Sequence, residues 1–147
     1  MIYKQNCHFK EIEHTADVGI CASGPSLPGL FASALYGMYS VMLGDTDIVE
    51  NDILNLDLKE DSLEELLNSW LSEINYLALV KKFFVHAIPE MQITESDNGY
   101  HLKAKLSGDL NPKYDQYFQT EIKAITYHQL KIEKSPQGYT AQIIFDI

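Results

Sequence analysis

The sequence predicts an α+β fold in which two helices pack against a mixed or antiparallel sheet. Two stretches, 27–43 and 62–80, carry apolar residues at helical spacing. Most of the stretches with strand-like alternation follow the second of them. Neither an internal repeat nor a linker is recognisable in the 147 residues, so we expect one domain over residues 1–147.

The first helix is predicted over residues 27–43. Ser26 is suited to cap its N-terminus, Pro28 fits its first turn, and Gly44 suits its C-terminal cap. Apolar residues three and four apart form one stripe, which we attribute to core packing. The stripe comprises Leu30, Phe31, Ala34, Leu35, Met38 and Met42.

The second helix is predicted from Ser62 to about Val80. Ser62 and Glu65 have the spacing of a capping box. Trp70 is the only tryptophan and falls within the apolar stripe, so we expect it to anchor the core rather than to bind a ligand. The stripe comprises Leu63, Leu66, Leu67, Trp70, Leu71, Ile74 and Leu77.

Alternation of apolar and polar residues predicts the strands, and turn residues separate them. Pro89 interrupts one strand, which is therefore expected to be bulged or to lie at a sheet edge. Asp97-Asn98-Gly99 predicts a hairpin turn, and a polar loop is expected over about 108–120. The predicted strands cover residues 7–13, 18–22, 54–59, 83–88, 91–94, 100–106, 127–134 and 139–145.

The composition narrows the class of function. The formal net charge is −10, which argues against a sequence-independent grip on RNA or DNA and suits a protein that binds cations or a basic partner surface. Cys7 and Cys21 are the only cysteines, so a disulfide framework is not expected and a reducing compartment is the simpler interpretation. No stretch has the character of a signal peptide or a membrane span, which predicts a cytoplasmic protein.

Carboxylates near the two ends of the sequence are the most informative chemical groups. Strand alternation points Asp17 and Asp146 away from the apolar faces of their strands, and the α-carboxylate of Ile147 follows directly. If the first and last strands are neighbours, these groups meet at one rim and form an oxygen-only site for a divalent cation, Ca²⁺ or Mg²⁺/Mn²⁺. The alternative is a solvated chain end with an ordinary surface aspartate.

Two further side chains are candidates for a role beside this site. His14 could donate a hydrogen bond to Asp17 or tune the site, although a single histidine is more often structural. Lys123 lies between Ile122 and Ala124 in an otherwise apolar segment that is expected to be a strand. It could neutralise the acidic site or contact a phosphate, and the alternative is a surface lysine whose stem covers apolar residues.

Other catalytic or metal-binding patterns are weak or missing. Cys7, His8, His14 and Cys21 match no standard zinc spacing, and adjacent strand residues face opposite ways. The sequence has no glycine-rich phosphate loop, no Gly-x-Ser-x-Gly motif and no recognisable cysteine nucleophile motif. It therefore shows no self-contained catalytic centre.

Three segments together resemble the archease family: Glu13–Gly19, the expected strand Glu121–His128, and the terminal Asp146-Ile147. The order of elements between them also agrees, so the resemblance covers essentially the whole chain. It implies a small cytosolic accessory protein, not an enzyme. Such a protein activates the GTP-dependent tRNA-splicing RNA ligase by promoting its guanylylation and multiple turnover.

The resemblance also implies functional residues. Asp17, Asp146 and the terminal carboxylate of Ile147 would bind a divalent metal, and Lys123 would matter for activation. Two alternatives stay open from the residues alone. One is a metal-dependent phosphoester hydrolase that uses Asp17, His14 and Asp146, and the other is a general chaperone or protein-interaction module.

Overall fold

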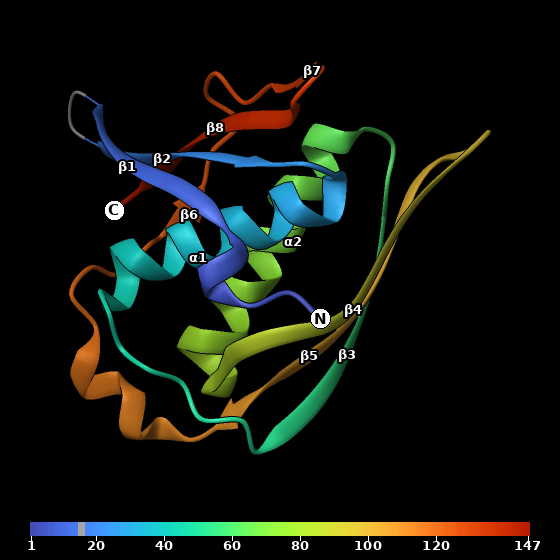
Figure 1. Cartoon of the computed structure of the whole chain (residues 1–147). Helices are drawn as coiled ribbons and strands as arrows, with labels where there is room; N and C mark the ends of the chain where they lie inside the picture. Colours follow the sequence, from blue (N-terminus) through green and yellow to red (C-terminus); the bar gives the residue numbers. More distant parts are fainter. Residues whose placement is uncertain (15–16) are drawn as a thin grey trace.

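The computed structural model describes residues 1–14 and 17–147, and in these residues it shows two sheets with two helices between them (Figure 1). The helices are α1 (Leu27–Leu43) and α2 (Leu63–Tyr76). Each described strand pairing is antiparallel. The predicted α+β class is therefore confirmed, in its antiparallel form.

The larger sheet has five strands. Its main path runs from β1 (His8–His14) through β2 (Asp17–Gly24) and β8 (Gly138–Asp146) to β6 (Ala124–Ile125). On the same side as β6, β8 also pairs with β7 (Ile132–Ser135). The central position of β8 lets the end of the chain contact segments that are distant in sequence.

The smaller sheet has the order β3 (Asp52–Glu60), β5 (Gly99–Leu110) and β4 (Phe83–Ser96). The predicted hairpin turn joins β4 to β5, with Ser96 opposite Gly99. Gly99 has a φ of +117°, a conformation that residues with a Cβ rarely adopt.

Local signals in the sequence account for the helix ends. The Ser26 hydroxyl accepts a hydrogen bond from the Gly29 N–H at 3.2 Å, and the Ser62 hydroxyl accepts one from the Glu65 N–H at 3.1 Å. Gly44 ends α1 with a φ of +61°. The second helical segment extends to Lys81, close to the predicted end at Val80. Its α-helical part, α2, ends at Tyr76, and Leu77–Lys81 form a π-helical turn.

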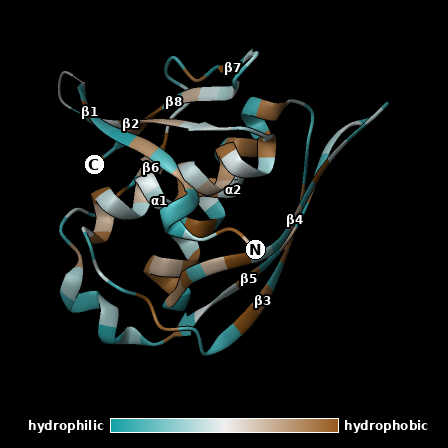
Figure 2. Ribbon diagram, in the orientation of Figure 1, coloured by the Kyte–Doolittle hydropathy of each residue, from teal (hydrophilic) through white to brown (hydrophobic). Residues whose placement is uncertain are grey.

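The hydrophobic core lies where the helices meet both sheets. Figure 2 shows hydrophobic residues recurring along the helices and the strands that flank them. Trp70 is fully buried, and its indole N–H donates to the Phe31 carbonyl of α1 at 2.9 Å. This confirms its predicted role as a core anchor, because the hydrogen bond satisfies its one polar atom inside the core.

Pro89 lies within a continuous strand that is both bulged and at an edge. The pairing of β4 with β5 shifts register between Val85 and Ala87 and again between Ala87 and Glu90. The freed Val85 N–H donates to the Tyr39 hydroxyl at 2.8 Å. The prediction of one strand that is bulged or at an edge is confirmed, and the interruption at Pro89 takes the form of bulges that absorb the proline without ending the pairing.

The predicted polar loop over 108–120 is only partly irregular. Residues 108–110 complete β5, and Pro112–Tyr117 form a 3₁₀ helix. Asp109 holds this junction, because its buried carboxylate accepts hydrogen bonds from the Tyr114 hydroxyl at 2.8 Å and from the Asn51 amide at 3.2 Å. Burial alone would raise the pKa of Asp109, but these bonds and the Lys113 ammonium lower it below its ordinary value.

We expect Asp109→Asn to lower the free energy of unfolding by about 1 kcal/mol at neutral pH, because two charge-assisted hydrogen bonds become neutral ones. A lowered folded-state pKa stabilises the fold above the unfolded pKa, and this contribution is lost as the pH falls through the folded value. The difference between the two proteins should therefore be constant above about pH 5 and should close at lower pH. Urea unfolding at a series of pH values measures it, and a difference that widens in acid would contradict the assignment.

Both cysteines are free, as expected. None of the described helices combines the length and the hydrophobicity that are needed to cross a bilayer.

Candidate functional site

Strand pairing brings the start of β2, where Asp17 lies, beside the end of β8, where Asp146 lies. Asp17 begins β2 and Asp146 ends β8, and these strands are antiparallel neighbours with Val18 opposite Phe145. Continuing this register by one residue brings Asp17 opposite Asp146, and residues directly opposite on antiparallel strands project to the same face. The neighbour of the last strand is the second strand, however, and not the first, because β2 lies between β1 and β8.

The burial pattern defines the face on which the carboxylates lie. Phe145 and Ile143 are fully buried and point toward the helices, whereas Asp146 is exposed and Asp17 is partly exposed. The exposure of Asp146 agrees with the face predicted for it, although Ile144 on the same face is also buried, so burial does not alternate strictly at the end of β8. Both aspartates belong to the outer face of the sheet, where a cation could reach them from solvent.

The donor set has the chemistry of a hard-cation site. The predicted ligands are the side-chain carboxylates of Asp17 and Asp146 and the α-carboxylate of Ile147, all of which would offer oxygen. No hydrogen bond or ion pair to another described residue is formed by the Asp146 side chain, so its oxygens are available as ligands. These residues fit Ca²⁺, Mg²⁺ or Mn²⁺ by ligand type.

A hollow of about 450 Å³ adjoins Ile147 on the helix side of the sheet. Glu11, Ser40 and Asp45 contribute to its lining, and the Ser40 hydroxyl donates to the Glu11 carboxylate at 2.8 Å. Two acidic side chains therefore lie near the end of β8 on this side as well, one of which, Asp45, is paired with the Lys4 ammonium at 3.8 Å. A concentration of like charge attracts cations and basic surfaces.

The backbone brings Lys123 beside the same aspartate. The Lys123 N–H donates to the Asp146 carbonyl at 2.7 Å, and the next residue, Ala124, pairs with Asp146 in β6. The Lys123 side chain is exposed. The structure thus places the main chain of Lys123 beside that of Asp146.

The expected strand Glu121–His128 is wrong in extent, because only Ala124–Ile125 form a strand. Lys123 therefore precedes the strand instead of lying within it. The physical reason is that α2 takes two of the carbonyl groups that a longer strand would present to a neighbour. The Asn75 amide donates to the Ile122 carbonyl and the Asn68 amide donates to the Ile125 carbonyl, each at 2.9 Å.

The predicted strand 127–134 is likewise shorter than expected. Residues 127–130 form a turn, in which the Leu130 N–H donates to the Tyr127 carbonyl at 3.1 Å and Gln129 has a φ of +56°. Strand β7 begins only at Ile132.

The predicted role of His14 lies outside the described side chains. Its backbone is the register partner of Asp17. The same motif includes residues 15–16, which are outside the described part of the chain.

The described residues give no support to a zinc site. Cys7 is partly buried, and burial raises the pKa of its thiol against a smaller opposing effect of a hydrogen bond with Ser33, which disfavours the thiolate that zinc requires. Cys21 is exposed on β2. Across residues 1–14 and 17–147, no three His, Cys, Asp or Glu side chains converge on a position where they could share a metal ion. The proposed carboxylate site depends on two side chains and a main-chain carboxylate, a different donor set.

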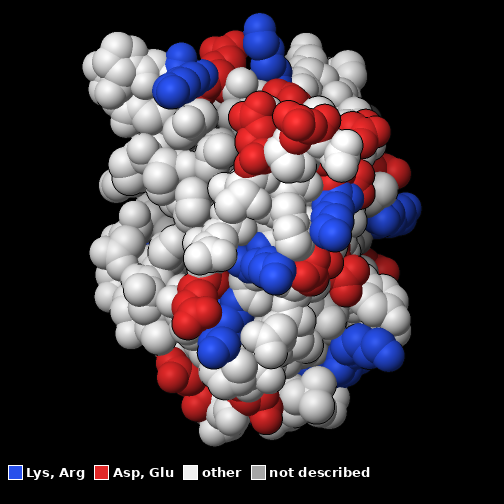
Figure 3. Space-filling view, turned by 90° about the vertical axis from the view of Figure 1, so that its right-hand side faces the viewer, with Lys and Arg blue, Asp and Glu red and all other residues white. Residues whose placement is uncertain are grey.

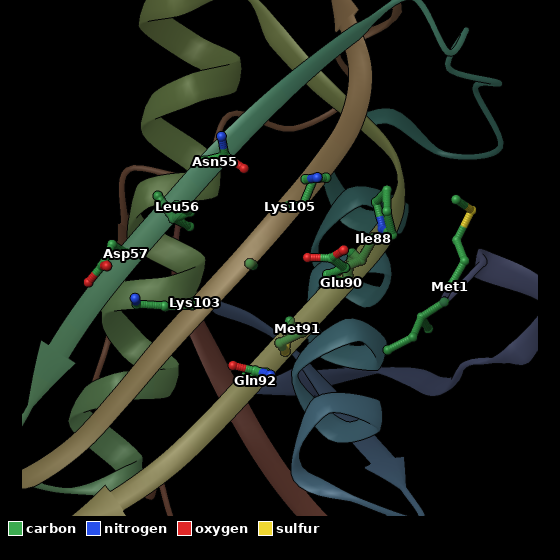
Figure 4. A pocket seen from close by; sticks show the side chains of 13 residues that line it. Met1, Asn55, Leu56, Asp57, Ile88, Glu90, Met91, Gln92, Lys103 and Lys105 are labelled. Carbon is green, nitrogen blue, oxygen red and sulfur yellow. The ribbon is translucent and has the colours of Figure 1, made fainter.

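A larger hollow of about 660 Å³ lies on the smaller sheet (Figure 4). Asp17 and Asp146 belong to the larger sheet, so they lie away from it. Figure 4 shows Lys103 and Lys105 on β5 between polar residues of the two neighbouring strands. In register, Asp57 lies opposite Lys103 and Glu90 lies opposite Lys105, so acidic residues flank both lysines. Figure 3 shows the same mixture of charges over this side of the molecule. The side shown therefore lacks the continuous basic patch that nucleic-acid backbones require.

Asn68 and Asn75 are site-supporting residues that sequence reasoning missed. Both are more than nine-tenths buried on α2, among residues assigned to its apolar stripe. Buried amides that interrupt an apolar face require hydrogen-bond partners, and their spacing of seven residues places them on one side of the helix. This spacing of two asparagines within the apolar stripe was the sequence signal that could have identified them.

Comparison with known sequences identifies the family. A model of the archease protein family matches residues 9–147. Archease proteins from Methanosarcina mazei and Thermococcus kodakarensis are each 36% identical to the chain, over 97% and 95% of it, and over 98% of their own lengths. The archease of Methanosarcina acetivorans is 34% identical over 97% of this chain and 98% of its own.

Solved structures agree on the fold. The solution structure of protein 1598 from Methanobacterium thermoautotrophicum has a TM-score of 0.78 and 24% identity, and the match covers 95% of this chain and 98% of that one. The crystal structure of an archease from Thermotoga maritima, described as a possible chaperone, has a TM-score of 0.59 and 23% identity over 92% of this chain and 94% of its own. With a family model that spans residues 9–147 and relatives that align over nearly their whole lengths, the chain belongs to the archease family.

Proposed function

We propose that this protein is a cytoplasmic accessory activator of the GTP-dependent tRNA-splicing RNA ligase. In this proposal a divalent cation is held by Asp17, Asp146 and the α-carboxylate of Ile147. The observation that carries it is the register of β2 and β8, in which Val18 lies opposite Phe145. Continued by one residue, this register would bring Asp17 opposite Asp146. Membership of the archease family supports the same assignment.

The arrangement suits presentation of a cation to a second protein. A hard cation organises triphosphates and offsets the negative charge that develops during nucleotidyl transfer. The aspartates lie at the end of two strands and on the outer face, so they can approach a partner's active site without rearrangement of the core. The negative charge around them favours association with a basic cleft.

Lys123 has a matching role in this proposal. Its backbone is bound to Asp146 and its side chain extends into solvent, so the ammonium can contact a phosphate or an acidic group of the partner. The protein supplies positioned charges, and the ligase performs the covalent chemistry.

The test is multiple-turnover ligation by the purified ligase with and without this protein. We expect Asp17→Asn and Asp146→Asn each to lower the stimulated rate by at least about tenfold while circular dichroism stays unchanged, because each substitution removes a charged metal ligand. Asp97→Asn is the matched control, since it makes the same change at the exposed tip of the β4–β5 hairpin. Full stimulation by both site variants would contradict the proposal.

The same preparation separates the two other functions that the sequence left open. Hydrolysis of phosphoesters by this protein alone, lost in Asp17→Asn, would favour a metal-dependent hydrolase. Metal-independent suppression of aggregation for unrelated proteins, without stimulation of the ligase, would favour a chaperone, as the Thermotoga maritima protein is described.

A further inference from the structure

Two buried asparagines of α2 hold the segment that leads to the candidate metal centre. Asn68 is 8% exposed and Asn75 is 7% exposed, and each side-chain amide donates to a main-chain carbonyl between β5 and β7. Both bonds are 2.9 Å long. Each acceptor belongs to a peptide group whose N–H is bonded to β8.

The first of these connections ends at Asp146. The Asn75 amide donates to the Ile122 carbonyl, and the N–H of the same peptide group, that of Lys123, donates to the Asp146 carbonyl at 2.7 Å. One peptide group thus links α2 to the main chain of a proposed metal ligand. Hydrogen bonds in such a chain polarise one another and strengthen the whole.

The second connection ends two residues earlier in β8. The Asn68 amide donates to the Ile125 carbonyl, and the N–H of that peptide group, on Thr126, donates to the Ile144 carbonyl at 3.0 Å. The Ser72 hydroxyl donates to the side-chain oxygen of Asn68 at 3.1 Å and thereby fixes the orientation of its amide.

The two connections match in length. Seven residues of an α-helix rise about 10.5 Å, and the three residues from Ile122 to Ile125 span about 10 Å when extended. The segment runs antiparallel to α2, because the later asparagine contacts the earlier carbonyl. Two rigid attachments at matched spacing fix both the position and the direction of the segment.

Core packing alone does not explain Asn75. Its side-chain oxygen is buried and, among the described residues, it is the one buried side-chain polar atom without a hydrogen-bond partner. A buried acceptor without a partner is unfavourable, so an apolar residue would serve a purely packing role better. The part of Asn75 that is used is the N–H that reaches Ile122.

We propose that Asn75 and Asn68 are positioning residues, which fix Asp146 and the backbone of Lys123 relative to Asp17 through the peptide groups Ile122–Lys123 and Ile125–Thr126. This role rests on the proposed function, because it concerns the same carboxylates. Asn75 acts on the residue that carries the carboxylate, and Asn68 acts two residues away, so Asn75 has the larger effect on the site.

The test compares Asn75→Leu and Asn68→Leu with Trp70→Phe. Trp70→Phe is a matched control because it also removes a buried donor on α2 that reaches a main-chain carbonyl at 2.9 Å. This carbonyl, however, belongs to Phe31 of α1 and not to the segment that leads to the candidate metal centre. We expect Asn75→Leu to speed amide hydrogen exchange of Lys123 roughly tenfold or more, and Asn68→Leu to do the same for Thr126. Trp70→Phe should leave the ratio of these rates to those of the core strands unchanged.

Calorimetric affinity for Ca²⁺ and Mn²⁺ provides the functional readout. It should fall at least about fivefold in Asn75→Leu, less in Asn68→Leu, and not in Trp70→Phe, whereas a purely structural role would predict equal effects at equal loss of stability. Asn75→Ala repeats the test if the leucine variant does not fold. The positioning role would be overturned by unchanged amide exchange of Lys123 or by unchanged cation affinity in a folded Asn75 variant. This holds even if Asp146→Asn abolishes stimulation of the ligase. If Asp146→Asn stimulates fully while Lys123 exchange responds as expected, the proposed function is wrong and the attachment of Asp146 to α2 stands.

Discussion

Gly19→Val is expected to lower the free energy of unfolding by about 2–3 kcal/mol, which is roughly 4–12 °C in melting temperature, and to abolish divalent-cation binding. Gly19 lies opposite Ile144, two residues from the start of β2. A Cβ at this position would come within 2.7 Å of the Ile143 carbonyl oxygen and 2.8 Å of the Ile144 Cδ1. The Ile144 side chain can rotate away from the added Cβ. The Ile143 carbonyl oxygen belongs to the backbone and can move only if β2 and β8 separate.

Separation of the strands at Gly19 would act directly on the candidate metal centre. Asp17 is two residues along β2, and its alignment with Asp146 depends on the same register. A shift by one residue would turn one aspartate to the opposite face, and a smaller displacement would still change the distance between the ligands. The loss of cation affinity should therefore exceed what the loss of stability alone explains.

Cys21→Val is the matched control for this experiment. Cys21 follows Gly19 by two residues on the same face of β2, but it is exposed. The added methyl groups should meet solvent there, so we expect the melting temperature to change by less than about 2 °C and cation affinity to be retained. Thermal melts and calorimetric titrations of the two variants measure the effect. Wild-type affinity in Gly19→Val would show that the register of β2 and β8 does not determine the site.

The helices could be predicted from sequence because the residues that start and end them act locally. Ser26, Gly44 and Ser62 form the caps that their positions indicate, and the apolar stripes give the buried faces. The strand alternation of residues 139–145 likewise predicted which face Asp146 occupies. These features depend on neighbours within a few residues, so no tertiary information was required.

Segment 121–128 could not be predicted as it folds, because long-range hydrogen bonds determine its structure. Ile122 and Ile125 are buried while Lys123 and Ala124 are exposed, a spacing that departs from strict strand alternation. The carbonyls of the two isoleucines bond to side chains of α2, whose positions no local pattern in the segment reveals. The order of strands was also beyond local reasoning: alternation assigns faces, but it does not determine that β2 rather than β1 pairs with β8.

A divalent cation is expected to raise the melting temperature of the protein, and Asp146→Asn should remove this effect. A ligand at one hundred times its dissociation constant stabilises the folded state by about 2.7 kcal/mol, or roughly 6–11 °C for a chain of this size. Chelator should reverse the shift. Separate titrations with Ca²⁺, Mg²⁺ and Mn²⁺ would rank the three ions that the oxygen ligands fit.

The same substitution should have the opposite sign when no cation is present. The register of Val18 with Phe145, continued by one residue, would bring Asp17 opposite Asp146, and the α-carboxylate of Ile147 follows Asp146, so these negative charges would repel when no cation is bound. We therefore expect Asp146→Asn in chelator to be at least as stable as the unsubstituted protein, whereas Asp97→Asn should keep the full cation-dependent shift. An ordinary surface aspartate would give neither the gain in chelator nor the loss of the shift. A metal site that lowers stability when no cation is bound would give both the gain in chelator and the loss of the shift. A full cation-dependent shift in melting temperature in Asp146→Asn would therefore show that no metal centre lies at this edge of the sheet.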